Sequence, residues 1–173
     1  MAETGVWLHA ADVTLAALQR HVDPAIAAFD LHEEGSSWAQ HLRIRARCTD
    51  GRELALRVKR CAGSTFGASE VEYYTRDYVD LPDAPLVRCF HAAFQPGVGY
   101  HLLLQDLGDS HADRRGQAPT LAHGVSLARA LARLHRHHWQ RQAAPPAAVL
   151  ERYLDHVRGG LQAIRRDTGL AAL

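Results

Sequence analysis

The sequence predicts an α+β fold in which an antiparallel sheet carries one packed helix and is followed by further helices. Residues 41–47 and 54–59 alternate apolar with polar side chains, and a turn at Gly51 joins them, which indicates a β-hairpin. Residues 100–104 are apolar without alternation, as expected of a buried strand. A helix is expected between these strand regions, beginning at Ser69.

The first thirty residues are expected to be helical. Residues 11–20 place Val13, Ala17 and Leu18 at helical spacing, and a second short helix is expected over residues 24–29. We expect both helices to brace the sheet that follows.

The middle of the chain supplies the helix and the second strand pair. Ser69, with Glu72 three residues later, forms a predicted capping box for a helix that reaches about residue 79. Residues 86–94 are expected to form a strand and residues 95–99 a turn leading into 100–104. The predicted sheet therefore has at least four strands, mostly antiparallel.

The end of the chain is expected to be helical. Apolar side chains recur at helical spacing over residues 121–142 and again over 150–164, and Pro145 and Pro146 lie between them. These helices carry more apolar side chains than a short helical pair can bury internally. We therefore expect either self-association or a missing partner lobe.

Composition excludes several classes of protein. A formal net charge of +1 gives no global field for nucleic acid or anionic membranes, so nucleic acid is an unlikely partner and no membrane partner is expected. Cys48, Cys61 and Cys89 have no CxxC spacing and are expected to be buried thiols in a reducing compartment. No apolar stretch approaches the roughly 20 residues of a membrane span. The expected location is the cytoplasm.

Two cations and two carboxylates form the candidate chemical group. Arg57 and Lys59 share one face of the predicted strand, and either could contact a phosphate. A strand cation facing a cleft needs a carboxylate partner, so one of the two should lie within salt-bridge reach of Glu70 or Glu72. Glu70 is the preferred partner, because the capping box already occupies Glu72.

The order of these motifs resembles the aminoglycoside phosphotransferase and choline and ecdysteroid kinase-like family over residues 31–140. The motifs are the Glu-x-x-Tyr-Tyr helix that begins at Glu70, the strand after Pro85, the Leu-Leu-Leu-Gln-Asp-Leu segment over 102–107 and the helix around residues 131–139. The resemblance implies a protein-kinase-like amino-terminal lobe followed by helices of an incomplete second lobe.

The resemblance also implies a nucleotide site. It implies an adenine-binding hinge at Gln105, Asp106 and Leu107. It also implies a phosphate-covering turn over Glu34-Gly35-Ser36-Ser37, with phosphate contacts at Ser36 and Ser37. The expected domains are an amino-terminal helical brace over 1–30, a nucleotide lobe over 31–108 and a helical segment of a truncated second lobe over 109–173. ATP is the expected cofactor, weak or vestigial in this chain.

The catalytic part of the family pattern is missing from this sequence. There is no His-Gly-Asp tripeptide, because Val125 follows His123-Gly124, and Asp106-Leu107-Gly108 follows an apolar strand without a preceding catalytic loop. Magnesium is therefore expected only in a longer form, the histidines are not expected to hold a structural metal, and no catalytic residue is assigned.

Three functional interpretations remain open from the sequence. The chain is the ATP-binding portion of a small-molecule phosphotransferase that is inactive alone, or a noncatalytic nucleotide-binding or protein-interaction module. The third interpretation is an anion- or RNA-binding domain that uses Arg43, Arg45 and Arg47 on the first hairpin strand.

Overall fold

The structure is a computed structural model of the 173-residue chain. It describes residues 5–35, 39–62, 68–108, 111, 118, 120–139, 151, 154–155 and 157–158. The chain divides into two compact units, Met1–His137 and His138–Leu173, whereas the sequence suggested boundaries after residues 30 and 108. The sheet and the helices described next belong to the first unit.

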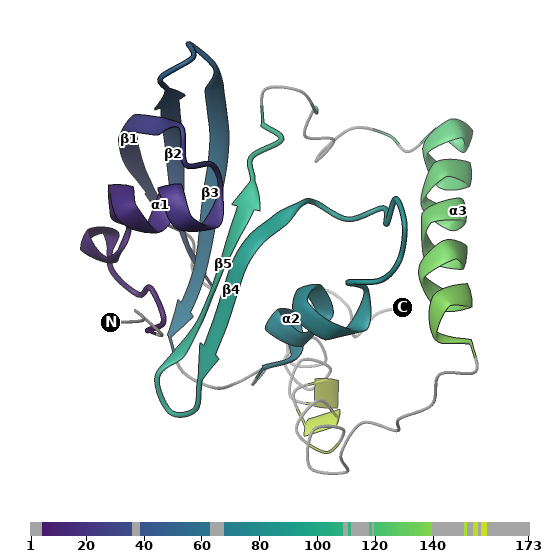
Figure 1. Ribbon diagram of the computed structural model, residues 1–173. Coiled ribbons are helices and arrows are strands. Elements are labelled where there is room, and N and C mark those ends of the chain that lie inside the picture. The colour runs from purple at the N-terminus through teal and green to yellow at the C-terminus, as the bar shows by residue number, and fades with distance from the viewer. Residues whose placement is uncertain are drawn as a thin grey trace. The chain divides into compact units, whose positions relative to one another are not determined.

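Five antiparallel strands form a single sheet in the order β1-β2-β3-β5-β4 (Figure 1). The strands are β1 Ile26–Gly35, β2 Gln40–Cys48, β3 Glu53–Ala62, β4 Cys89–Gln95 and β5 Gly99–Gln105. The expected α+β class and antiparallel sheet are confirmed. Strand β3 lies at the centre of the sheet and pairs with β2 on one side and with β5 on the other.

The first strand occupies a segment for which the sequence predicted a helix. Strand β1 begins at Ile26, which pairs with Cys48, so the predicted helix over residues 24–29 is wrong. The Asp23 carboxylate accepts a hydrogen bond from the N–H of Ala25 at 2.9 Å and turns the chain into the sheet. Pairing with β2 outweighs the helix propensity of the local alanines.

The expected helix over residues 11–20 is confirmed in slightly shifted form. A short 3₁₀ turn, η1 Ala10–Asp12, precedes α1 Leu15–His21. The Thr14 hydroxyl caps α1 by accepting from the N–H of Ala17 at 3.1 Å. Helix α1 lies across β1, β2 and β3 in Figure 1, and its Leu18 is fully buried.

Alternate residues of the central strands feed two apolar clusters on opposite faces of the sheet. Leu103 of β5 belongs to the cluster under α1, whereas its neighbour Leu102 belongs to the cluster next to helix α2. In β3, Leu56 and Val58 face α1, and Arg57 and Lys59 therefore face the other side. The predicted hairpin with two distinct faces is confirmed.

The helix after β3 changes type along its length. It begins as α2 Ser69–Glu72 and continues as a π-helical turn, η2 Tyr73–Asp77. The predicted capping box is wrong, because Ala68 occupies the N-cap position and Glu72 pairs with Arg76 at 3.2 Å. Since π-helical turns occur frequently at functional sites, the switch at Tyr73 marks this helix for attention.

Gly99 allows an unusually close approach of β5 to β3. Its φ is +143°, and a Cβ atom placed on it would lie 2.2 Å from the carbonyl oxygen of Cys61. Glycine alone fits this position, because both the backbone conformation and the space exclude a side chain. Tyr100 therefore enters β5 at a fixed distance from β3.

Helix α3 Leu121–His138 confirms the predicted helix that follows the sheet. Arg133 donates to the carbonyl oxygen of Pro82 at 2.6 Å, and His137 lies 3.0 Å from the Asp80 carboxylate. Leu134 is buried, but several other apolar side chains of this region are exposed: Leu121, Val125, Leu127, Leu131 and Trp139. The expected uncovered apolar face is present in the described structure.

The second unit begins with His138, the last residue of α3, and Trp139, which lies in a turn. Its other described residues are helical and fall within the range where the sequence predicted a helix: Glu151, Leu154, Asp155, Val157 and Arg158. Within this unit Arg158 lies 3.2 Å from the Asp155 carboxylate. Among the described residues of the whole chain, no helix combines the length and the apolar character that crossing a membrane requires.

All three cysteines are free thiols. Cys48 is buried, as expected, but Cys61 and Cys89 are only half-buried, so the expectation of buried thiols is wrong for these two. Cys61 faces the α2 side of the sheet, where packing is less complete than under α1.

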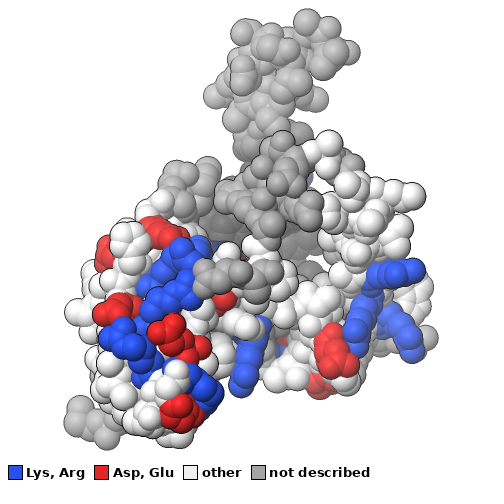
Figure 2. All heavy atoms as spheres, turned by 90° about the horizontal axis from the view of Figure 1, so that it is seen from above, with Lys and Arg blue, Asp and Glu red and all other residues white. Residues whose placement is uncertain are grey.

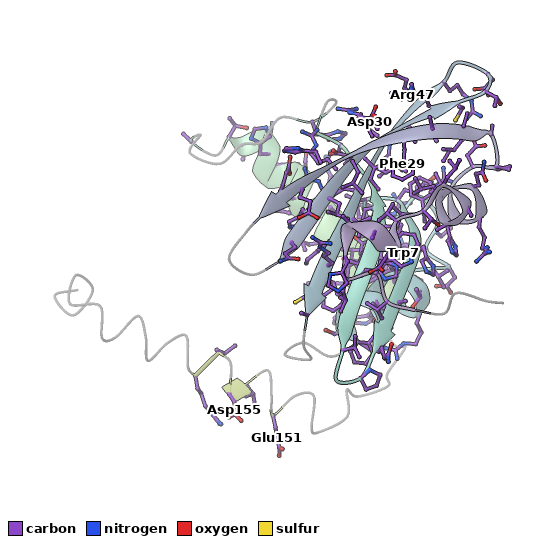
Figure 3. All side chains as sticks on the ribbon, turned by 90° about the vertical axis from the view of Figure 1, so that its left-hand side faces the viewer. Trp7, Phe29, Asp30, Arg47, Glu151 and Asp155 are labelled. Atoms are coloured by element: carbon purple, nitrogen blue, oxygen red, sulfur yellow. The ribbon has the colours of Figure 1, made fainter. Side chains whose placement is uncertain are left out.

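Three histidines and Trp7, which is labelled in Figure 3, tie the amino-terminal segment to the sheet. The backbone N–H of Trp7 donates to Nδ1 of His101 at 2.9 Å, and the two rings stack. His91 stacks on His21 at 3.9 Å between ring centroids. Burial, reinforced by neighbouring histidines, lowers the pKa of His101 to about 3 and that of His91 to about 4.

We expect this cluster to make the fold sensitive to acid. Because the folded-state pKa values lie below the unfolded value of about 6.5, the unfolded chain binds more protons and stability is lost as pH falls from about 6.5 towards 4. His101→Gln should reduce the slope of the unfolding free energy by about 1.4 kcal/mol per pH unit in that window. Urea unfolding at several pH values measures the slope.

The control is His32→Gln, which removes an exposed histidine from β1. It should leave the slope unchanged. If His101→Gln and the unsubstituted chain show the same pH dependence, the buried cluster is not the acid-sensitive group.

Candidate functional site

An ion pair joins the central strand to the helix that follows it. Nζ of Lys59 on β3 lies 2.5 Å from Oε1 of Glu70 on α2, and both side chains are partly exposed. The expected pairing of a strand cation with Glu70 or Glu72 is therefore present, through Lys59 and Glu70. The sequence left the choice between Lys59 and Arg57 open, and the structure makes Lys59 the partner of Glu70.

The second oxygen of Glu70 is also bound. The hydroxyl of Tyr100 on β5 donates a hydrogen bond to Oε2 of Glu70. Burial, together with this hydrogen bond and the charge of Glu70, raises the pKa of Tyr100 far above its usual range, so the hydroxyl keeps its proton. Sequence reasoning missed Tyr100, because a tyrosine at the start of an apolar strand resembles an ordinary core residue.

Arg57 belongs to a second group of charges on the same face of the sheet. Its guanidinium lies 3.2 Å from Glu34 on β1 and 3.8 Å from Asp106 at the end of β5. Arg43 on β2 bonds to the same two carboxylates, with its Nε 2.8 Å from Asp106 and its Nη1 3.7 Å from Glu34. These four side chains connect β1, β2 and β3 to the predicted hinge, and we call them the hinge network.

The Asp106 carboxylate is the buried member of the hinge network, with its side chain only 5 % exposed. Burial alone would raise its pKa, but the N–H of Gly108 and the guanidinium groups of Arg43 and Arg57 outweigh that effect and hold the pKa below its usual value. Asp106 therefore remains an anion bound within the protein.

Backbone hydrogen bonds of the predicted hinge are also used inside the fold. The backbone N–H of Gln105 donates to the carbonyl oxygen of Arg88, and that of Asp106 donates to the carbonyl oxygen of Ala55, each at 2.9 Å. The carbonyl oxygen of Leu107 accepts from the N–H of His111 at 2.8 Å. An adenine ring at this hinge could therefore not use the N–H groups of Gln105 or Asp106 as donors.

His41 lies between the two charged groups. It pairs with Lys59 across the β2–β3 ladder. Burial first, and then the charges of Arg57 and Lys59, lower its pKa, so the ring stays neutral near pH 7. A neutral ring adds no positive charge to this face.

A cavity of about 580 Å³ opens beside the Lys59–Glu70 pair. Its lining combines aromatic, apolar and polar side chains and consists of Ala39, Lys59, Cys61, Ser69, Glu70, Tyr73, Tyr74 and Tyr100. The volume falls within the range typical of small-molecule sites. The cavity is lined by the paired cation and not by the hinge residues.

The predicted phosphate-covering turn and a possible metal site are considered next. Ser36 and Ser37 lie outside the described residues, although Glu34 and Gly35, which the sequence placed in a turn, are the last residues of β1. Among the described residues there is no group of three or more histidine, cysteine or acidic side chains placed to hold a metal ion.

Acidic partners accompany the arginines of β2. Arg47 lies 2.6 Å from Asp30, and these two labelled side chains lie close together in Figure 3. On the face drawn in Figure 2, basic side chains lie next to acidic ones and do not form one continuous basic patch. Sequence reasoning missed the role of Arg43, because its partner Asp106 lies 63 residues further along the chain.

Comparisons of this chain with protein-family models, with curated proteins and with solved structures gave no match. The class defined by fold and site is an α+β protein with a cation–carboxylate pair between strand and helix, next to a cavity.

We expect Asp106 to hold the hinge network together. Asp106→Asn should lower the free energy of unfolding at pH 7 by about 1–3 kcal/mol, because it leaves two guanidinium groups without their buried partner. Since the folded pKa of Asp106 is depressed, its contribution is present above the usual aspartate value of about 3.9 and is lost as pH falls below that value. Urea unfolding at pH 7 and pH 3 measures both effects.

Asp30→Asn is the matched control. It removes the acid of an exposed pair, with Asp30 71 % exposed, and should cost less than about 1 kcal/mol. Equal losses for the two variants at pH 7 would show that Asp106 acts as an ordinary surface charge.

Proposed function

We propose that the sheet and α2 form the nucleotide-binding part of a protein similar to aminoglycoside phosphotransferases and choline and ecdysteroid kinases. In this proposal the chain binds ATP weakly and does not transfer its phosphate alone. The observation that carries the proposal is the Lys59–Glu70 ion pair between β3 and α2. Such a pair presents a fixed ammonium group to a phosphate in protein kinases and related enzymes.

The order of the elements supports the same proposal. A hairpin, β2–β3, is followed by α2 and then by a second hairpin, β4–β5, that leads into the polar segment at Gln105. This is the order that the family resemblance implies. The β3–β5 pairing also brings the strand that carries Lys59 next to the strand that ends at Gln105. Lys59 pairs with Leu102, three residues before Gln105.

The residues fit an adenine nucleotide only in part. Lys59 can meet a phosphate, but the N–H groups of Gln105 and Asp106 are already bonded within the fold. Arg57 is held by Glu34 and Asp106 and would have to leave them to reach a phosphate. We therefore assign Lys59 as the phosphate contact and Arg57 to the hinge network, and we expect weak binding.

The alternative of an anion or RNA site on β2 has less support. Arg43 and Arg47 are both held by carboxylates. Binding of an anionic polymer would have to break these pairs, whereas counterion release favours cations that are available for phosphate. Lys59 is also paired, but unlike these arginines it lines a cavity of about 580 Å³, which favours a small nucleotide at Lys59 over RNA at β2.

We expect ATP to bind with a dissociation constant no tighter than about 1 mM, or roughly 4 kcal/mol. Lys59→Met should abolish most of the amide shifts seen in an NMR titration with ATP. Arg57→Met removes an equal charge from the same strand face and should lower stability more than it lowers ATP affinity. The shifts in the unsubstituted chain should concentrate near Lys59 and Gln105.

Two outcomes would contradict this assignment. One is submicromolar RNA binding with shifts at Arg45 and Arg47 and none near the hinge. The other is an ATP response that is identical in the Lys59→Met variant, because a bound phosphate that does not sense this charge is not at the proposed site.

We expect no phosphoryl transfer from this chain. The sequence contains no His-Gly-Asp catalytic tripeptide, and positioning alone leaves the reaction without a base. Incubation with labelled ATP, magnesium and a panel of small hydroxyl compounds should give no labelled product above background. Turnover that survives repurification and disappears in Lys59→Met would contradict the expectation.

A further inference from the structure

Tyr100 occupies a constrained position at the start of β5. Its neighbours in the sheet are Cys61 on β3 and Phe94 on β4, and its side chain is almost fully buried. Gly99, the residue before it, brings the β5 backbone against the carbonyl of Cys61. Its ring packs in the apolar cluster with Val71 of α2. Backbone and ring thus leave the hydroxyl few directions in which to point.

That hydroxyl completes the coordination of Glu70. Oε1 of Glu70 accepts from Lys59, and Oε2 accepts from Tyr100. A carboxylate held at both oxygens by donors from two different strands cannot rotate about its last side-chain bond without losing one of them. The direction of the Lys59 ammonium group therefore depends on a residue that need not touch a ligand's phosphate.

We propose that Tyr100 is a positioning residue that fixes the Glu70 carboxylate and, through it, the direction of Lys59 towards a bound phosphate. The functional half of this inference rests on the proposed nucleotide site. The structural half, that the Tyr100 hydroxyl fixes the orientation of the Glu70 carboxylate, does not depend on the nucleotide site.

The structure around Glu70 supports this role over a simple core function. Helix α2 has only four residues before it becomes the π-helical turn η2, so its own hydrogen bonds give Glu70 little support. Val71 is the buried residue of α2. The two bonds to Glu70 are therefore a main connection between this short helix and the sheet.

Tyr74 provides a matched control within the same cavity. It also lines the cavity beside Glu70, and burial raises its pKa to about 12. Its hydroxyl is not the one that bonds to Oε2 of Glu70, which is that of Tyr100. Tyr74→Phe and Tyr100→Phe thus remove the same group from one cavity, and only the second removes the donor to Glu70.

The first measurement needs no nucleotide. In the full chain labelled with ¹³C in glutamate side chains, the Glu70 carboxylate signal is identified by its loss in Glu70→Gln. Tyr100→Phe should shift that signal, and Tyr74→Phe should leave it in place. An unchanged Glu70 signal in Tyr100→Phe would overturn the proposal.

A reciprocal measurement keeps the hydroxyl in place. With tyrosine labelled at the ring carbon that bears the hydroxyl, Glu70→Gln should shift the Tyr100 signal and leave the Tyr74 signal nearly unchanged. This readout decides the question if Tyr100→Phe does not fold. Equal shifts at both tyrosines would indicate a general rearrangement of the cavity and would contradict a specific bond.

The second measurement is the NMR titration with ATP. Tyr100→Phe should weaken binding about threefold to tenfold, as expected for the loss of one typical intramolecular hydrogen bond, and Tyr74→Phe less than twofold. In a Glu70→Ala background, which leaves no acceptor for the hydroxyl, Tyr100→Phe should have no further effect, because the two residues act through one bond. Additive losses in this double-variant cycle would overturn the positioning role.

Failure of the nucleotide proposal gives a different result. If the unsubstituted chain does not respond to ATP at all, the proposed function is wrong. The measurements of the Glu70 carboxylate signal and of the tyrosine ring-carbon signals still decide whether Tyr100 orients Glu70.

Discussion

The alternation of side chains along β3 is the constraint on which the rest of the structure depends. Because successive residues face opposite sides of a strand, Leu56 and Val58 complete the apolar core under α1 while Arg57 and Lys59 emerge on the other face. A shift of one residue in register would place two cations in that core. The core thus fixes which face carries the charges, and the charges define the candidate site.

The two charged groups on that face serve different purposes. The hinge network centres on the buried carboxylate of Asp106. Removal of one of its partners would leave a buried charge unpaired, which lowers the stability of the fold. The Lys59–Glu70 pair has no member as buried as Asp106, lies beside a cavity and is supported by one neutral donor. We infer that the first group holds strands together, and under the proposed function the second is the part that meets the ligand.

Features set by local pattern were predictable from the sequence. The hairpin, the buried strand of β5 and the helix over α3 follow from periodicity that can be read within about ten residues. The segment at Ile26 could not be predicted in this way, because its conformation depends on pairing with Cys48, 22 positions later. In the site, the sequence predicted that a strand cation, Arg57 or Lys59, would pair with a helix carboxylate, and the structure selects Lys59. The partners Arg43 and Tyr100 were not predicted, because strand order brings them to the site from distant positions.

The close contact at Gly99 has a mechanical consequence for the sheet. Strand β5 is pinned against the carbonyl of Cys61 at Gly99 and spans seven residues, about 20 Å between its ends, to Gln105. Tyr100 sits next to the pin and Asp106 just beyond the far end. Because β5 pairs with β3 on one side and with β4 on the other over this length, Tyr100 and Asp106 lie at the two ends of one doubly paired strand. A side chain introduced at Gly99 would therefore disturb both ladders, and its effect would not be confined to Tyr100.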